Sequence, residues 1–394
     1  MKMQEINFKS PFITSRSRVI SHLIGLSMVS IFLPIKIYPV VFAVSLLMML
    51  YRISLKYYVF SFFASLILLL IVFTSTYTIQ DDETVTAIIK SILGISFLII
   101  SSIFSYEKTN SVEMLKIIHK YISAIILLCF IQVVFLHAQS GGYGLTASDS
   151  YTAGFIFDSD YALFGGNDKN MFGAKVALFG ILQYILHKSI YKKGAVIWML
   201  IVLITGFLSM SRTPVAFLIA ILALYKISSS RGVAMKIVAA FFVITVLAIA
   251  SPYIFDYLRL SSINQGQLSD GMSIRILYWI AVISNTDVIG LFGNGLLSAR
   301  DFLPKYSAYY NGEPNVHNLY LNTYLDLGAI GAAFYIAMII SLFIYLKNLN
   351  PQLAFVFIAS SFVMSCTLYT AYDIEMWCFL SLSVVISRLI RTSR

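Results

Sequence analysis

Charged residues and cysteines are scarce in this sequence of 394 residues. Only 12% of the residues are charged and 59% are hydrophobic, so the chain has too little polar surface to fold as a soluble domain. The three cysteines, Cys129, Cys366 and Cys378, lie in apolar runs without CxxC spacing, which argues against a disulfide framework and against a cysteine metal site. No basic run is interleaved with aromatic residues, so the net charge of +10 does not indicate nucleic-acid binding.

Long apolar runs take the place of charge. Because a helix needs ~20 apolar residues to cross the hydrocarbon layer, these runs predict an all-α polytopic membrane protein with about 12 transmembrane helices. With no internal repeat or low-complexity linker, the chain is interpreted as a single transmembrane domain over residues 1–394. The predicted spans centre on 18–34, 37–51, 57–74, 86–104, 117–137, 171–187, 194–210, 213–227, 234–250, 321–346, 351–370 and 375–390.

The distribution of basic residues predicts the orientation of these spans. Most of the 28 lysines and arginines fall in short connections that lie on one side, and the positive-inside rule makes this side cytoplasmic, together with both termini. Two long segments, 138–170 and 251–320, then lie outside, where long ordered loops usually carry function. The basic residues that remain on the outer side are Lys36, Lys90, Lys169, Lys175, Arg212, Arg259, Arg275, Arg300 and Lys305.

Two of these outer arginines are candidates for binding an anion. Arg212, in GFLSMSRTPVAF, lies between two apolar spans, and Pro214 behind it suits the first turn of a helix whose N-terminus favours anions. Its guanidinium either extends to lipid phosphates at the membrane surface or grips a phosphate or pyrophosphate by paired hydrogen bonds. Arg275, in SIRILYW, either belongs to the solvated face of an interfacial helix or takes part in the same binding.

The segment NVHNLYLNTYLDLGAIGAAFYI, residues 315–336, carries the strongest local pattern. His317 and Asn318 precede an apolar helix. Helical spacing would place five residues near one face: His317, Leu321, Tyr324, Gly328 and Gly331. The two glycines predict close approach of a second helix. His317 is either a residue bonded in place at the start of the helix or a neutral imidazole that activates a hydroxyl.

These motifs together resemble the bacterial O-antigen ligase and Wzy-type polysaccharide polymerase superfamily. The resemblance rests on His317-Asn318 with the following glycines, on SMSRTPVAFLIAILAL, on SIRILYWIAVISNTDVIGLFGNG, and on NDKNMFGAKVALF, which includes Asn170. It covers roughly residues 165–345. The alanines Ala332 and Ala333 stand where ligases often have Thr or Gly-Thr, which weakens the ligase assignment.

The resemblance implies a C-type glycosyltransferase fold in the bacterial inner membrane, with the active site on the periplasmic face and no cofactor or metal. The implied donor and acceptor are undecaprenyl-pyrophosphate-linked glycans, and a chain-length-regulating co-polymerase is an implied partner. Arg212 and Arg275 would bind the donor pyrophosphate, and His317 would orient or deprotonate the acceptor hydroxyl, with supporting roles for Asn318, Tyr324, Gly328, Gly331 and Asn170.

The function expected from these residues is polymerisation of lipid-linked repeat units into O-antigen or capsule-like polysaccharide. An O-antigen ligase that transfers the glycan to lipid A-core is the alternative. A lipid-glycan flippase or transporter is a lesser alternative, because the predicted spans hold few charges near the bilayer midplane. Three carboxylate groups on the outer side are expected to be solvated turns rather than catalytic or metal sites: Asp81-Asp82-Glu83, Asp158-x-Asp160 and Asp373-x-Glu375.

Overall fold

The computed structural model describes most of the chain. It covers residues 11–54, 58–78, 81–106, 110–140, 154–158, 160–192, 195–211, 215, 217–222, 225 and 271–393. Secondary structure in these ranges is helical apart from one isolated bridge between Ile53 and Phe104. The predicted all-α class is therefore confirmed.

Helices occur at ten of the predicted spans. They are α1 (Pro11–Ser30), α2 (Tyr38–Leu50), α3 (Val59–Ser75), α4 (Asp82–Ile103), α5 (Ser111–Gln139), α7 (Lys169–Tyr191), α8 (Val196–Leu208), α13 (Leu319–Leu349), α14 (Pro351–Thr367) and α15 (Ile374–Thr392). The predicted span 213–227 is described only in part, and 234–250 lies outside the described residues. The count of about 12 spans therefore stays a prediction.

Several of these helices have the length and composition of membrane spans. Among the described residues, Asp82–Ile103, Ser111–Gln139 and Leu319–Leu349 are long and apolar enough to cross a bilayer, and shorter apolar helices accompany them. Large apolar side chains such as Val40, Leu47 and Leu69 are more than 60% exposed, which suits a lipid environment. The protein is an integral membrane protein.

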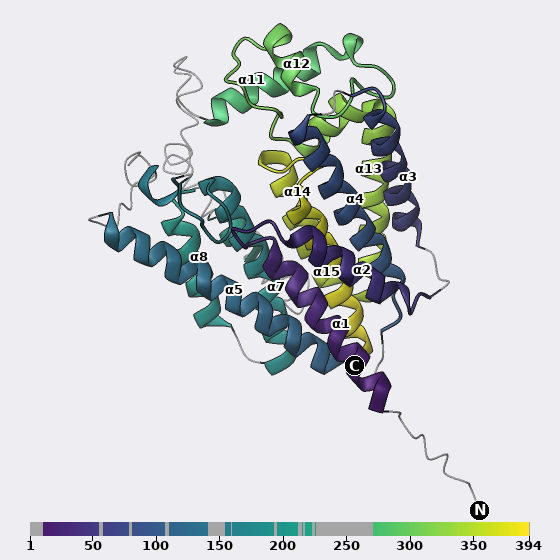
Figure 1. Ribbon diagram of the computed structural model, residues 1–394, viewed down its shortest axis with the longest axis vertical. Helices are drawn as coiled ribbons and strands as arrows, with labels where there is room; N and C mark the ends of the chain where they lie inside the picture. Colours follow the sequence, from purple (N-terminus) through teal and green to yellow (C-terminus); the bar gives the residue numbers. More distant parts are fainter. Residues whose placement is uncertain are drawn as a thin grey trace, which may run out of the picture.

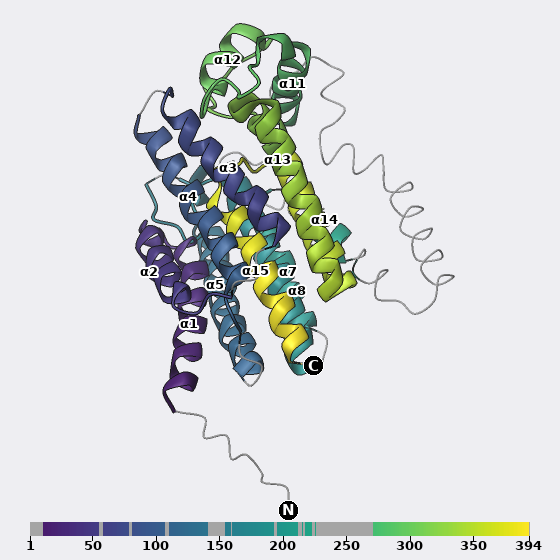
Figure 2. The same ribbon diagram turned by 90° about the vertical axis from the view of Figure 1, so that its right-hand side faces the viewer.

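Two helices form the centre of the bundle. Nearly every residue of α15 is buried, and α7 is buried over most of its length. Around them α13 packs on α3 and α14, while α1 and α7 pack on α5 (Figures 1 and 2). Because α15 has no lipid-facing side, it tolerates Ser381, Ser383 and Ser387 along its length.

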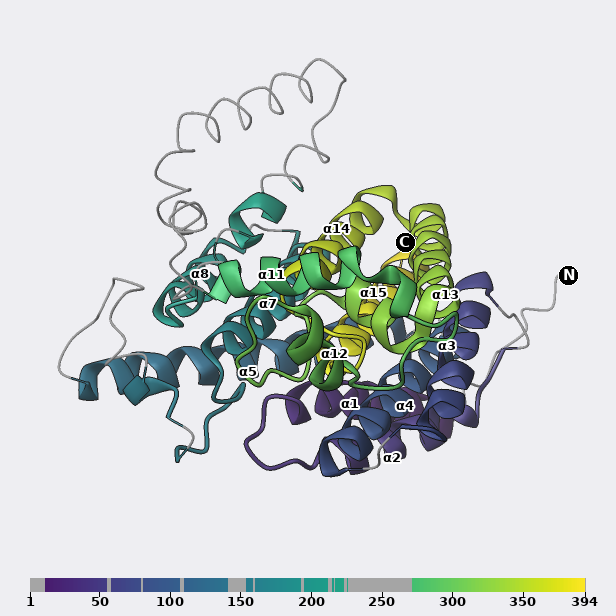
Figure 3. The same cartoon turned by 90° about the horizontal axis from the view of Figure 1, so that it is seen from above.

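A small module covers one end of the bundle. It comprises α11 (Gly271–Ser284), the 3₁₀ turn η3 (Thr286–Val288), α12 (Ala299–Tyr306) and the segment that leads to α13, and residues 271–318 are called the cap module below. Its own apolar core includes Tyr278, Val282 and Phe302. Figure 3 shows α11 and α12 lying across the ends of α13, α14 and α15, and Figure 1 shows the start of α1 and the end of α15 at the opposite end of the bundle.

Gly328 joins the cap module to the bundle. It interrupts α13 with φ 70° and ψ −169°, a region open essentially to glycine alone. A Cβ at this position would collide with the backbone of Leu291 and Gly293. The predicted reason for glycine is therefore wrong at Gly328, since the close neighbour is loop backbone and not a second helix. A Cβ on Gly331 would meet Leu327 of the same helix.

Candidate active site

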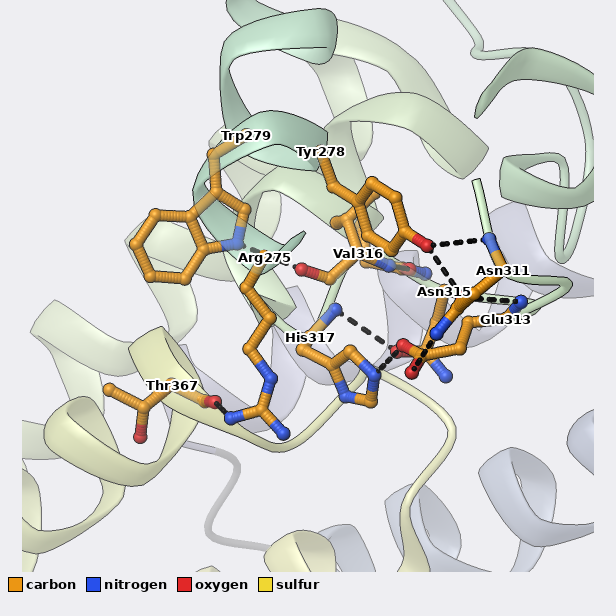
Figure 4. Close-up of polar contacts among 10 residues, drawn as sticks. Arg275, Tyr278, Trp279, Asn311, Glu313, Asn315, Val316, His317 and Thr367 are labelled. Atoms are coloured by element: carbon orange, nitrogen blue, oxygen red, sulfur yellow. Dashed lines mark hydrogen bonds and ion pairs between the residues drawn. The ribbon is translucent and has the colours of Figure 1, made fainter. Parts of the chain in front are cut away.

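Helix α11 positions one side of the candidate site. Arg275, Tyr278 and Trp279 are spaced i, i+3 and i+4, so they lie on neighbouring parts of one helix face. The indole of Trp279 donates to the Val316 carbonyl at 2.8 Å, and the Tyr278 hydroxyl donates to the Asn311 side chain at 2.6 Å. Two contacts from one helix therefore hold the loop that carries His317 (Figure 4).

The end of α14 holds the other side. Arg275 Nη1 donates to the Thr367 carbonyl at 2.8 Å, and Asn318 Nδ2 donates to the neighbouring Cys366 carbonyl at 3.1 Å. These carbonyls lie in the last turn of the helix, whose partial negative charge favours a cation such as Arg275. Arg275 and the start of α13 are thus fixed to the same helix end.

His317 lies just outside α13. Its φ of 50° is uncommon for a residue other than glycine, and its backbone N–H donates to Asn315 Oδ1 at 3.0 Å. Asn318 then caps the helix by accepting from the N–H groups of Tyr320 and Leu321, both at 3.1 Å. The prediction that His317 lies on a helix face is therefore wrong, because the helix begins at Leu319.

A carboxylate that the sequence analysis did not single out is bonded to His317. Glu313 accepts from His317 Nε2, and its second oxygen accepts from Asn311 Nδ2 at 3.1 Å. The bond to Nε2 leaves Nδ1 as the basic nitrogen of a neutral ring. The spacing of four between Glu313 and His317 was visible in the sequence, but Pro314 and the loop between them gave no sign that the side chains meet.

The pKa of Glu313 depends on both candidate residues, His317 and Arg275. The hydrogen bond from His317 is the main cause that holds the pKa of Glu313 below its usual value, against the opposing effect of burial, and the charge of Arg275 lowers it further. Figure 4 shows the guanidinium of Arg275 beside the His317 ring. A base with a carboxylate partner and a fixed cation therefore lie together on the cap module.

The remaining predicted residues lie at varying distances from this cluster in the fold. Tyr324 is half-buried and packs against the core of the cap module. Asn170, near the start of α7, accepts from the Ser211 hydroxyl at 2.8 Å, which ties α7 to the residue just before Arg212. Arg212 itself lies outside the described residues. Among those described, no hydrogen bond joins Asn170 to His317 or Arg275.

One of the three carboxylate groups fits the expectation of a solvated turn, because Asp158 and Asp160 are exposed and Asp158 accepts from the Asp160 N–H. The other two groups differ from it. Asp81 caps α4 and pairs with Arg300 of the cap module, and these contacts, first of all the one from the Thr84 N–H, lower its pKa to about 2. Glu375 is buried and forms an ion pair with Lys175 at 2.8 Å. The prediction of a solvated turn is wrong for Glu375, because burial required a partner. No group of three or more His, Cys, Asp or Glu side chains in the described ranges is placed to hold a metal ion.

Comparison with known families gives a match over part of the chain. Residues 196–336 match the family model described as O-antigen ligase. The chain is similar to that family over this range. The match confirms the resemblance to the O-antigen ligase and polymerase superfamily, and it supports a glycosyltransferase-like enzyme that acts on lipid-linked glycans in the membrane. No curated protein matches the chain significantly.

The matched range, residues 196–336, includes the whole cluster. Its limits enclose the cap module and the kink of α13, and therefore Arg212, Arg275, His317 and Glu313. Asn170 lies outside the matched range and reaches it only through Ser211. The contacts that orient His317 thus come from within this range, except for the carbonyls at the end of α14.

Proposed function

We propose that this protein is a polymerase of undecaprenyl-pyrophosphate-linked repeat units, working on the periplasmic side of the bacterial inner membrane. The observation that carries the proposal is the His317–Glu313 pair beside Arg275, inside the range that matches the O-antigen ligase family. Both reacting groups of such a transfer, a hydroxyl and a pyrophosphate, find a matching side chain in this cluster.

The reaction forms one bond and breaks another. A hydroxyl oxygen at the non-reducing end of the acceptor repeat attacks the anomeric carbon of the donor glycan, and the bond from that carbon to the pyrophosphate oxygen breaks. His317 Nδ1 takes the hydroxyl proton, while Glu313 stabilises the imidazolium that results. Arg275 and Arg212 neutralise the charge that develops on the undecaprenyl pyrophosphate leaving group. The step needs no metal in this scheme.

The cap module gives this arrangement its rigidity. Arg275 is anchored at Thr367, and the His317 loop is held by Trp279 and by Asn318. Catalytic groups held by such surrounding contacts lose little free energy to reorganisation when the substrate binds.

An O-antigen ligase is the second candidate function, because the matching family model carries that description. Ligase and polymerase share the donor and differ in the acceptor. The alanines after Gly331 favour the polymerase.

Surface glycans of a deletion strain separate the two functions. Loss of a polymerase leaves single repeat units attached to the surface core, whereas loss of a ligase leaves a bare core and an accumulation of lipid-linked polymer. Wild-type protein should restore polymer in the deletion strain, and His317→Ala should not, at equal membrane abundance. A bare core would overturn the polymerase assignment.

A further inference from the structure

A cavity lined with lysines lies outside the His317 cluster. Its volume is about 480 Å³, a size typical of small-molecule sites. The wall is formed by the turn between α1 and α2, by the segment before α7, and by parts of α4, α7 and α15 near their N-termini. The ionisable side chains that line it are Lys36, Lys90, Lys175, Asp160 and Glu375.

Lysines outnumber carboxylates among the charged side chains that line this cavity. Lys175 is buried and forms an ion pair with Glu375, and it also approaches the Ile31 carbonyl at 3.4 Å. Lys36 is exposed, and the half-buried Lys90 interacts electrostatically with Glu375 and Asp373 without forming a direct ion pair with either. Three lysines and two carboxylates, Asp160 and Glu375, line the cavity, so its lining carries a net positive charge that favours an anion.

A backbone hydrogen bond holds two walls of the cavity together. The N–H of Gly165 donates to the Phe32 carbonyl at 2.7 Å, joining the segment before α7 to the α1–α2 turn. Gly166 has φ 94°, and a Cβ there would lie 3.9 Å from Lys175 Nζ. Two of the walls are therefore held together by backbone, with lysine side chains directed between them.

One short segment of the chain connects the cavity with the candidate active site. Helix α14 ends at Thr367, which binds Arg275, and α15 begins at Ile374, which lines the cavity. Within that segment the Tyr372 hydroxyl donates to Asp326 of α13, just before the Gly328 kink. A short, buried segment thus separates the two sites.

The helix that follows the cavity's α1–α2 turn exposes an apolar stripe. Helix α2 begins just after Lys36, and its side chains Val40, Val44 and Leu47 are 67%, 43% and 67% exposed. These residues follow an i, i+4, i+7 pattern and make one apolar stripe along the helix. An amphipathic ligand with a charged head in the cavity would lay its hydrocarbon chain along this stripe.

We infer that this cavity binds the pyrophosphate head of a second polyprenyl-linked substrate, the acceptor repeat. The inference rests on the proposed polymerase, which must hold two polyprenyl pyrophosphates at once, one at Arg275 and the other a repeat unit away. Lys36 and Lys90 bind the acceptor's phosphates, and the Lys175–Glu375 pair forms the floor. The acceptor glycan then extends toward His317.

Binding of a sugar-free short-chain polyprenyl pyrophosphate tests the inference directly. In nanodiscs of zwitterionic lipid, wild-type protein should bind two equivalents, and Lys36→Gln/Lys90→Gln should bind one. Neither lysine is buried, so the variant should fold, and Lys305→Gln, which changes an exposed lysine on α12, is the matched control that keeps two. Two equivalents in the double variant, or one in the wild type, would overturn the assignment.

Kinetics with separate substrates give a second readout. With a donor blocked at its non-reducing end, the double variant should raise the KM of a lipid-linked acceptor roughly 10-fold or more, because each lysine would hydrogen-bond to a charged group. The KM of the donor should stay unchanged. An equal rise in both KM values, or in neither, would contradict an acceptor site.

Two further measurements distinguish a polyprenyl pyrophosphate from other sources of the bound anion. Inorganic pyrophosphate should compete weakly, because it lacks the chain that lies along α2, and anionic nanodisc lipid should leave the count at two. Displacement by the anionic lipid would overturn the inference in favour of an ordinary lipid headgroup. Glycan transfer to lipid A-core alone would refute the polymerase assignment. The number of polyprenyl pyrophosphate equivalents bound tests the cavity independently of that result.

Discussion

Replacing Glu313 by Gln tests the residue that the sequence analysis missed. The substitution keeps the shape of the side chain but removes the charge that faces His317. A hydrogen bond to a charged group is worth about 1.5–3 kcal/mol, and about 1.4 kcal/mol corresponds to a factor of ten in rate. Because the Glu313 side chain is 36% exposed and His317 is 20% exposed, solvent screening favours the lower end, a loss of roughly 10- to 30-fold in kcat.

The pKa of Glu313 determines the pH range in which its carboxylate supports His317. Bonding to His317 lowers the pKa of Glu313, so the carboxylate is ionised in the folded protein at and above its ordinary value of 4.5. Its contribution is therefore complete above that pH and is lost as the pH falls through the lowered pKa. From pH 5.5 to 8, the ratio of wild-type to Glu313→Gln activity should not change through titration of Glu313.

The assay is initial-rate polymerisation by purified protein with a lipid-linked repeat. Asp301→Asn is the matched control, because it removes an exposed carboxylate of the same module. The donor KM should be unchanged, since Glu313 acts on His317 rather than on the pyrophosphate. A Glu313→Gln enzyme with wild-type kcat at equal folded concentration would refute the catalytic pair.

Further predictions follow from the other elements. Arg275→Lys should retain fold and insertion but lose most activity at any pH, because an ammonium cannot reproduce the planar hydrogen bonding of a guanidinium, and we expect the same of Arg212→Lys; normal donor KM and kcat in an assay with chelator would contradict this. Gly328→Ala should lower the stability in detergent by about 2–6 kcal/mol through strain and collision with Leu291, whereas Gly206→Ala, where a Cβ makes an ordinary contact, should not. Reporters fused near Ser148 and Asn264 should be active only outside and one near Lys192 only inside, and a cytoplasmic signal at 264 would reverse the predicted orientation.

Local patterns were enough to predict much of the fold. The apolar runs gave the spans because hydrophobic length is a property of neighbouring residues, and ten of the described helices lie at predicted spans, whereas the short helix α12 was not predicted. The placement of basic residues and the local motifs selected Arg275, His317 and Asn318. The structure brings these residues together near the end of α14.

What the sequence did not reveal depends on contacts between distant segments. Lys175 and Glu375 meet across 200 residues of chain, and no periodicity relates them. The role of Gly328 depends on the loop at Leu291 and Gly293, which approaches only in the folded chain. Glu313 was missed for a different reason, since its partner is near in sequence but lies in a loop, where helical or strand spacing gives no direction to side chains.

The most direct test of the central claim is reconstitution of the purified protein with one undecaprenyl-pyrophosphate-linked repeat as the only glycan. This account predicts a ladder of longer lipid-linked products, with none formed by His317→Ala. Lipid A-core added in a parallel reaction should receive no glycan. Transfer to lipid A-core without any elongation of the lipid-linked repeat would contradict the polymerase assignment and identify a ligase.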